Sequence, residues 1–337
     1  MSTLKVNSIA NNGSAVDFPN GAFNIGGKSI LQGYTSSATE PASPSTGDFW
    51  WDSTNELLYQ YLNSKFKAIG ISNPFPWYVD TSSISYDSIS TGTFNEQYPR
   101  SFRLSVDGTK MYVIGNDDDR VYRLDLSTAW DLSTASYVQN FGVSGQSTTP
   151  HGIDFSYDGT KMFIMQNGGT LFSYTLSTAW DVTSASYDNK SLLLSTINSA
   201  NTGPLGLMFN IDGTKVYMPD YNGDKVYQYS LSTAFDISTL SYNNVSFGSA
   251  SLFQSVTDIY VNRAETHIYL SDSAADTVVE IVMSTASDLT NASLTSSYSH
   301  ATQADSAQGL HFSEDGTKMY ILQFSNDTIY QYTSGSA

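Results

Sequence analysis

Residues Ser105–Tyr112 read Ser-Val-Asp-Gly-Thr-Lys-Met-Tyr, and this phrase decides the fold because the chain repeats it. The Asp-Gly pair is typical of a tight turn, and the residues on either side of it suit β-strands. Further copies, one of them degraded, occupy 156–163, 210–217, 262–269 and 313–320. The third residues of successive copies are separated by 51, 54, 52 and 51 positions. Such a period predicts a fold assembled from five similar β units.

A second repeated phrase shows how the five units are joined. It contains an Asp followed two residues later by Ser or Thr, and its copies hold Asp80, Asp131, Asp181, Asp236 and Asp288. The copy with Asp80 lies before the first Asp-Gly turn, whereas the last repeat stops at Ala337, where its own copy would begin. The missing piece of the last repeat is therefore found near the start of the first. A repeat that closes on itself in this way predicts a ring rather than an open solenoid.

Each repeat contains four predicted strands. In the second repeat they cover 151–156, 161–166, 171–176 and 186–194, with turns between them. Four antiparallel strands in about 50 residues are typical of a propeller blade. The sequence thus predicts an all-β protein with a five-bladed β-propeller over 77–337, in which Ser85–Ser90 completes the last blade by pairing with Ile329–Thr333.

Composition excludes several classes of function. The 337 residues carry a formal net charge of −17, which argues against nucleic acid as a partner because phosphate binding needs clustered Lys and Arg. Cysteine is absent and only four histidines are present, so thiolate chemistry and His-rich metal sites are not expected. No apolar run is long enough for a transmembrane helix, and the first residues lack the apolar region of a signal peptide. No catalytic elbow, phosphate-binding loop or dinucleotide fingerprint appears, so no cofactor is predicted.

The first 76 residues lack the repeat and form a small β-rich region. We expect an anchor segment over 1–34, a Pro- and Ser-rich linker over 35–47 and a small β meander over 48–76. So short a region can hardly bury its large apolar groups alone. Those groups include Phe18, Phe23, Ile25, Trp50 and Trp51. We therefore expect this region to associate with copies of itself.

Two resemblances add to this interpretation. The Asp-Gly-Thr-Lys turns, each followed by Met-Tyr, Met-Phe or Val-Tyr, resemble the YVTN and lactonase-like propeller repeats. Residues 2–9, 16–19, 24–27 and 41–52 resemble the N-termini of tail-fibre and related virion proteins of tailed phages, the marine phages in particular. The second resemblance implies an N-terminal arm attached to the tail, trimeric association, and a location in the virion after assembly in the host cytoplasm.

Candidate binding residues come from the loops that precede the first strand of each blade, because loops that vary on a repeated scaffold often bind ligands. The predicted set, placed on the channel face, is Tyr98, Arg100, His151, Gln308 and His311. No metal ligand set is predicted, since the phased aspartates look like turn caps and the acidic turns such as Asn116–Asp119 suit turn formation as well as Ca²⁺.

The function expected from the sequence is therefore that of a non-enzymatic virion component of tail-fibre type. Its N-terminal arm would contact other tail proteins, and its propeller would serve structure or recognise a host-surface glycan or protein. The alternatives are a propeller enzyme, lactonase-like or glycan-cleaving, and a secreted carbohydrate-binding propeller.

Overall fold

The computed structural model describes residues 84–91 and 96–334 in full, and the strand backbone of short segments between residues 24 and 68. The chain divides into two compact units, Met1–Phe75 and Pro76–Ala337. Residues 1–23 of the expected anchor segment, the side chains of Trp50 and Trp51, and Asp80 lie outside the described residues.

The described segments of the N-terminal unit form two small sheets. Its strands are β1 (Asn24–Ile25), β2 (Lys28–Ser29), β3 (Tyr34–Ser37), β4 (Phe49–Asp52), β5 (Leu57–Leu62) and β6 (Lys65–Ala68). β1 pairs with β2, and β4, β5 and β6 form an antiparallel meander to which β3 adds a parallel strand. The segment 35–47, expected as a linker, therefore begins inside a strand, because Tyr34 and Thr35 suit a strand that can pair with β4.

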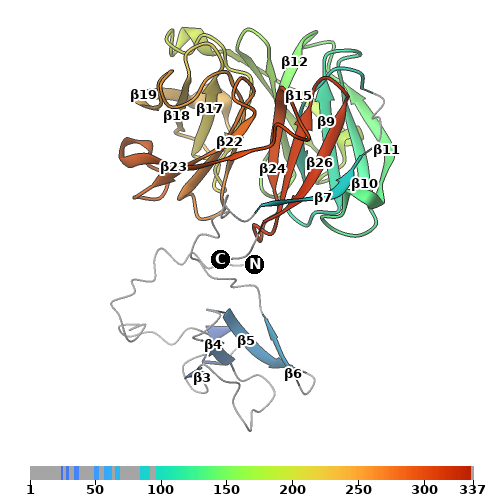
Figure 1. Ribbon diagram of the computed structural model, residues 1–337, viewed down its shortest axis with the longest axis vertical. Coiled ribbons are helices and arrows are strands. Elements are labelled where there is room, and N and C mark those ends of the chain that lie inside the picture. The colour runs from blue at the N-terminus through green and yellow to red at the C-terminus, as the bar shows by residue number, and fades with distance from the viewer. Residues whose placement is uncertain are drawn as a thin grey trace. The chain divides into compact units, whose positions relative to one another are not determined.

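The C-terminal unit is a five-bladed β-propeller, which confirms the predicted fold class (Figure 1). Each blade is a four-stranded antiparallel sheet, and no helix in the described part of the chain is long and apolar enough to cross a membrane. The first two blades consist of β8 (Pro99–Leu104), β9 (Lys110–Gly115), β10 (Arg120–Leu126) and β11 (Ala135–Gly142), then β12 (Pro150–Phe155), β13 (Lys161–Gln166), β14 (Thr170–Leu176) and β15 (Ala185–Leu193). The next two consist of β16 (Met208–Phe209), β17 (Lys215–Asp220), β18 (Lys225–Leu231) and β19 (Leu240–Phe247), then β20 (Val256–Val261), β21 (His267–Asp272), β22 (Thr277–Met283) and β23 (Ala292–Ser299).

The fifth blade closes the ring. It contains β24 (Ala307–Phe312), β25 (Lys318–Gln323) and β26 (Thr328–Thr333), and its fourth strand is β7 (Ser85–Ser90). Figure 1 shows β7, in cyan, beside β26, in red, with Tyr332 opposite Tyr86. Asp87 of β7 accepts hydrogen bonds from Lys318 Nζ at 2.8 Å and from Thr333 Oγ1 at 2.6 Å. The predicted pairing of the two ends of the propeller is confirmed.

The Asp-Gly turns join the first and second strands of four blades. In the first blade, Asp107 Oδ1 accepts hydrogen bonds from the Thr109 amide and from Ser105 Oγ, while Gly108 has a φ of +67°. The equivalent glycines, Gly159, Gly213 and Gly316, have φ values of 69° to 70°, as predicted. Glycine is favoured there because a Cβ strains this backbone conformation.

The aspartates of the second repeated phrase cap short 3₁₀ helices. Asp131, Asp181, Asp236 and Asp288 each accept a hydrogen bond from the amide two residues later. This confirms the capping role predicted for the four that the structure describes. The acidic turns on the other face are used similarly: Asp220 Oδ1 accepts from the Gly203 amide at 2.8 Å, and Asp272 Oδ2 accepts from the Gln254 amide at 2.7 Å.

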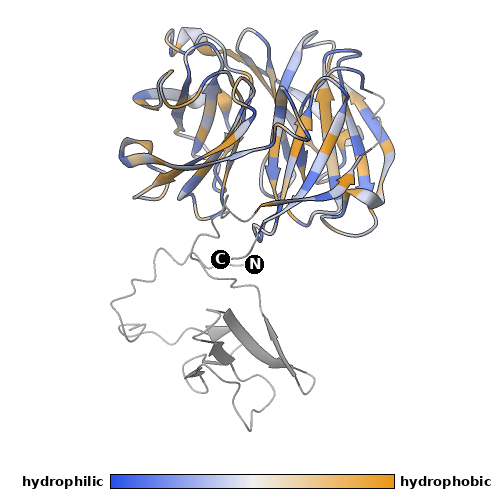
Figure 2. Ribbon diagram, in the orientation of Figure 1, coloured by the Kyte–Doolittle hydropathy of each residue, from blue (hydrophilic) through white to orange (hydrophobic). Residues whose placement is uncertain are grey.

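Five hydrophobic clusters fill the interfaces between blades. Each combines side chains from two neighbouring blades, and one joins Tyr320 and Leu322 of the fifth blade to Phe102 and Met111 of the first. Figure 2 shows hydrophobic residues (orange) alternating with hydrophilic ones (blue) along the blade strands. The first strands are almost wholly buried, and they surround the central channel, where the candidate site lies.

Candidate functional site

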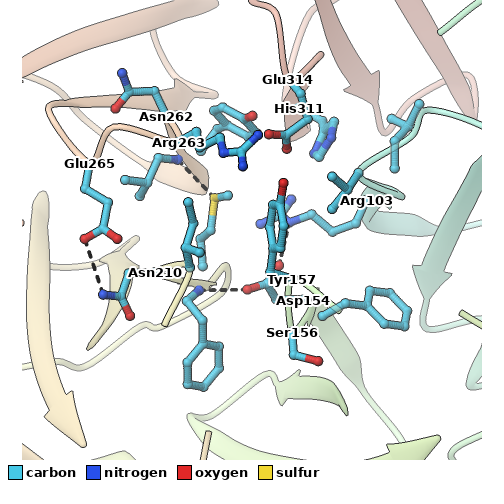
Figure 3. A pocket seen from close by; sticks show the side chains of 18 of the residues that line it. Arg103, Asp154, Ser156, Tyr157, Asn210, Asn262, Arg263, Glu265, His311 and Glu314 are labelled. Atoms are coloured by element: carbon cyan, nitrogen blue, oxygen red, sulfur yellow. Dashed lines mark hydrogen bonds and ion pairs between the residues drawn. The ribbon is translucent and has the colours of Figure 1, made fainter. Parts of the chain in front are cut away.

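A cavity of about 70 Å³ lies at the end of the channel where the first strands run into the Asp-Gly turns (Figure 3). At two positions of the repeat, the residues of all five blades line the cavity. The position four residues before the turn Asp supplies Arg103, Asp154, Met208, Tyr260 and His311, which we call the inner ring. The position just before the turn Asp supplies Val106, Tyr157, Ile211, Arg263 and Glu314, which we call the outer ring. Both positions hold a different residue in every blade.

Arg103 of the inner ring joins the blades at the centre of the channel. Its Nη1 and Nη2 donate to the two carboxylate oxygens of Asp258 at 2.9 and 3.0 Å. The same nitrogens donate to the carbonyl oxygens of Leu207 at 2.8 Å and of Leu310 at 3.3 Å. Its Nε lies 3.4 Å from Asp154 Oδ1. One side chain from the first blade thus reaches groups of the other four.

Small residues make room for this arrangement. The position two residues before the inner ring holds Ser101, Gly152, Gly206, Asp258 and Gly309. A Cβ on Gly206 would lie 2.6 Å from Asp258 Oδ1, and a Cβ on Gly309 would lie 2.8 Å from the ring of Phe102. Gly206 therefore leaves room for the Asp258 carboxylate that Arg103 binds, and Gly309 leaves room for the Phe102 ring of the neighbouring blade.

Burial sets the protonation of the inner ring. It raises the pKa of Asp154 to about 6, although the charge of Arg103 and hydrogen bonds from the Phe209 and Phe155 amides oppose the shift. It lowers the pKa of His311 well below its usual range, and the charge of Arg103 adds to that effect. Burial also raises the pKa of Tyr260. At neutral pH the inner ring therefore presents a neutral imidazole and a neutral phenol beside a buried cation.

The outer ring surrounds the mouth of the cavity. Figure 3 shows Tyr157, Arg263 and Glu314 reaching from three blades toward the same space. The Arg263 guanidinium carbon lies 5.2 Å from the centre of the Tyr157 ring, within cation–π range. Glu314 Oε2 is buried and has no hydrogen-bond partner among the described residues. Burial raises the pKa of Glu314, against the lowering effect of Arg263.

The first residue of each turn phrase holds the backbone of the turn in place. Ser105, Ser156 and Ser313 each accept a hydrogen bond from the amide five residues later through Oγ, and Asn210 and Asn262 do so through Oδ1. The second residue of the turn phrase has no such role, and it differs in every blade and lines the cavity.

The predicted binding residues divide between the two ends of the channel. Tyr98, Arg100, His151 and Gln308 lie at the start of the first strands, whereas His311 lies near the opposite end of β24, in the cavity lining. His311 therefore does not share a face with the other four, because a first strand crosses the whole depth of the blade.

The four remaining residues only partly form a group. Tyr98 is 49% exposed, and its ring centre lies 5.9 Å from that of Phe324. The Arg100 guanidinium carbon lies 4.1 Å from the centre of the same ring. His151 is buried, which lowers its pKa to about 3, and the nearby charge of Arg100 acts in the same direction. Gln308 is half-buried.

The sequence interpretation missed Arg103, Tyr157, Arg263 and Glu314. The signal that could have found the outer ring is the single variable position inside an otherwise nearly constant turn phrase. Within 84–91 and 96–334, no group of three or more His, Asp or Glu side chains is arranged to hold a metal ion.

The cavity can accept part of a small polar ligand. It is smaller than the few hundred cubic ångströms typical of sites that enclose a drug-sized molecule. On its floor Asp154 is already engaged, because its Oδ2 accepts from the Phe209 amide at 2.7 Å and its Oδ1 faces Arg103, whereas His311 Nδ1 is buried without a hydrogen-bond partner among the described residues. At the mouth, an aromatic ring, a guanidinium and a carboxylate face the same space and can contact a ligand.

Comparisons with known proteins give the following matches. A search with the sequence found no matching family model and no matching curated protein. Among solved structures, a protein of unknown function from Desulfotomaculum acetoxidans is 10% identical, with a TM-score of 0.42 over 68% of this chain and 64% of that one. A candidate 6-phosphogluconolactonase from Bacteroides uniformis is 14% identical, with a TM-score of 0.42 over 70% and 71%. Another, from Bacteroides fragilis, is 12% identical, with a TM-score of 0.45 over 70% and 80%.

Proposed function

We propose that this protein is a non-enzymatic virion component of tail-fibre type. In this proposal the N-terminal unit attaches the chain to other tail proteins, and the propeller recognises a group on the host surface through the cavity bounded by the inner and outer rings. The localisation that follows is the virion, after assembly in the host cytoplasm.

The observation that carries the recognition role is the convergence of the variable positions of the repeat. Ten residues at two repeat positions line one cavity, and no residue type recurs in either set. The constant residues of the same turns are used to hold the backbone. A scaffold that keeps its turns constant and varies the side chains facing one cavity is suited to binding.

The attachment role rests on the N-terminal sequence, whose phrases at 2–9, 16–19, 24–27 and 41–52 resemble those of tail-fibre proteins. We further propose that residues 1–76 associate with copies of themselves, because this unit is short and rich in large apolar residues, and that they do so as a homotrimer, the state that the resemblance to tail-fibre proteins implies. Light scattering tests this point: the full chain should be trimeric and residues 77–337 monomeric. A monomeric full chain would contradict the proposal.

An enzyme is the second candidate, and one observation favours it. Asp154 has a pKa raised to about 6 and lines a cavity together with neutral His311, a pairing that could serve acid catalysis. Against it, both oxygens of Asp154 already face groups of the protein. Screening the full chain on lactones and on aryl glycosides separates the candidates. Turnover that Asp154→Asn abolishes would establish an enzyme.

The virion assignment is tested on particles. Mass spectrometry of purified phage that encodes this chain should detect the protein, and antibodies raised against residues 77–337 should label the tail in electron micrographs. Labelling should persist after the particles are washed in high salt. Particles that lack the protein would overturn the assignment.

A further inference from the structure

We propose that the mouth of the channel cavity binds the terminal unit of a neutral saccharide, held by Glu314, Arg263 and Tyr157. This inference deepens the recognition role proposed above and rests on it for its biological meaning. The site lies at the opposite end of the channel from Tyr98 and Arg100.

Glu314 supplies the first reason. Its Oε2 is buried without a partner among the residues that the structure describes. A buried carboxylate oxygen that makes no hydrogen bond costs free energy, and a ligand that donates one removes that cost. A sugar hydroxyl is such a donor, and hydrogen bonds to a charged acceptor are stronger than neutral ones.

Arg263 and Tyr157 supply the second reason. Arg263 is exposed, so its guanidinium can donate hydrogen bonds to the oxygen of a neighbouring hydroxyl while staying near the Tyr157 ring. Tyr157 is half-buried and presents an aromatic surface on which the C–H face of a sugar ring can pack. A carboxylate, a guanidinium and an aromatic ring facing one space match the alternating hydroxyls and C–H face of a saccharide.

The charges around the cavity favour a neutral ligand over a charged one. Its lining carries two cationic side chains, Arg103 and Arg263, and three acidic ones, Asp154, Glu265 and Glu314. At the mouth Arg263 and Glu314 face the same space, so a charged ligand of either sign would be repelled by one of them, and the charge of Arg103 is already paired with Asp258. An anionic ligand would be repelled by the carboxylates and by a chain with a net charge of −17.

The cavity size limits what enters. A space of about 70 Å³ admits the edge of one sugar ring rather than an oligosaccharide. The rest of a glycan would extend outward past the turns. A terminal residue of a chain is therefore a better ligand than an internal one.

The experiment uses the purified full chain and saturation-transfer difference NMR. The probes are D-glucose, D-galactose, D-mannose and N-acetyl-D-glucosamine, with glycine as a zwitterionic probe and gluconate as an anionic one. We expect at least one sugar to bind with a millimolar dissociation constant. Glu314→Gln should weaken that binding about tenfold, since it removes the charge of the acceptor while keeping the shape of the side chain.

Matched substitutions identify the face that binds. Tyr157→Ala should abolish the sugar signal, whereas Tyr98→Ala, the same change at the other end of the channel, should leave it unchanged. Arg263→Ala should also weaken binding, and because Arg263 is exposed this variant should fold normally. Circular dichroism of each variant provides the folding control.

Three results would overturn the inference: no sugar binds, Tyr98→Ala removes binding while Tyr157→Ala does not, or only glycine or gluconate binds. These outcomes are separate from the particle test. Sugar binding by a protein that is absent from the virion would refute the virion assignment and leave the saccharide site standing.

Discussion

Arg103 is the residue on which the centre of the propeller depends. Its side chain is 97% buried and forms a bidentate ion pair with Asp258, which is fully buried. Removing one partner of such a pair leaves an uncompensated buried charge. This cost falls on all five blades, because the same guanidinium also binds main-chain carbonyls from several of them.

We expect Arg103→Met to lower the free energy of unfolding by about 3–5 kcal/mol. The control is Arg123→Met, which removes a more exposed bidentate pair with Asp125 and should cost about 1 kcal/mol or less. Urea denaturation of the two variants measures the difference. Equal losses of stability would show that the central ion pair has no special role.

The turn glycines are held by two constraints at once. Gly159 has a φ of +70°, and a Cβ there would overlap the indole of Trp180. In the fourth blade the equivalent position is Glu265, with a φ of +56°, and the residue in place of the indole is Ser287, which hydrogen-bonds to the Glu265 carboxylate. The backbone therefore accepts a side chain where the aromatic neighbour is absent.

Gly159→Val should destabilise the propeller by roughly 1–3 kcal/mol through backbone strain alone, and the overlap with Trp180 adds to this. Gly145→Val is the control, because its Cβ would meet open space. Thermal unfolding followed by circular dichroism measures both.

A double-mutant cycle separates the two constraints. If the overlap matters, Gly159→Glu and Trp180→Ser should be less harmful together than the sum of the single changes, by about 0.5–3 kcal/mol. Strictly additive effects would show that backbone strain alone fixes the glycine.

At the scale of single elements, β7 is the strand that completes the ring. Among the described strands it pairs with β26 alone, and Asp87 accepts hydrogen bonds from Lys318, Gln331 and Thr333 of the neighbouring strands. Tyr86 packs against Tyr330 and Tyr332, with ring centres 5.8 and 5.5 Å apart. The last blade therefore depends on a segment more than 200 residues distant in sequence.

Deleting residues 77–90 should abolish the cooperative unfolding transition of the whole propeller, because the open blade leaves β26 as an unpaired, apolar edge. Deleting 1–75 should leave the transition at the temperature of the full chain. Calorimetry compares the two truncations, and a 77–90 deletion that melts like its parent would contradict the role of β7.

The elements were largely predictable from the sequence, because the repeat fixes them locally. The first strand of the second repeat, predicted at 151–156, covers Pro150–Phe155, and the second covers 161–166 as predicted. The pairing of Ser85–Ser90 with the last blade was predicted from the order of the repeated phrases alone. The short strand β16 shows the limit: the third blade has Gly203-Pro204 near its start, and only Met208–Phe209 pairs as a regular strand.

The candidate site was less predictable. Repeat phase places Arg103, Asp154 and His311 at equivalent positions of three blades, but it does not reveal that one of them crosses the channel. The partner of Arg103 is Asp258, which lies at a different repeat position and 155 residues away. The room for the Asp258 carboxylate depends on the missing side chain of Gly206, and this becomes visible only in three dimensions.

At the scale of the whole molecule, buried histidines make the fold sensitive to acid. Burial lowers the pKa of all four histidines, and that of His151 falls to about 3. In the unfolded chain they bind protons near their usual pKa of 6.5. Below that pH the unfolded state therefore holds more protons than the folded state, and stability is lost as pH falls.

Carboxyl groups whose pKa burial raises act in the opposite direction. Asp154 keeps its proton in the folded state up to about pH 6, whereas its usual pKa is 3.8, so this group stabilises the fold on acidification below about pH 6. Burial raises the pKa values of Glu96, Glu265 and Glu314 in the same sense. The histidines should therefore dominate just below pH 6.5.

The urea midpoint should fall between about pH 7 and pH 5.5, with each histidine contributing up to about 1.4 kcal/mol per pH unit. His151→Gln should reduce the pH dependence of the free energy of unfolding by the equivalent of one proton. Arg123→Met, which changes no buried histidine, should leave that pH dependence unaltered. A midpoint independent of pH over this range would show that the histidines are not held neutral.

The pairing of β7 with β26 also has a mechanical consequence. A pull transmitted along the chain from the N-terminal side reaches β7 before any other described strand of the propeller, and among those strands β7 pairs with β26 alone. Tension on β7 is carried first by its pairing with β26 and by the hydrogen bonds that Asp87 accepts from Lys318, Gln331 and Thr333. The internal pairings of the other four blades do not strengthen that junction.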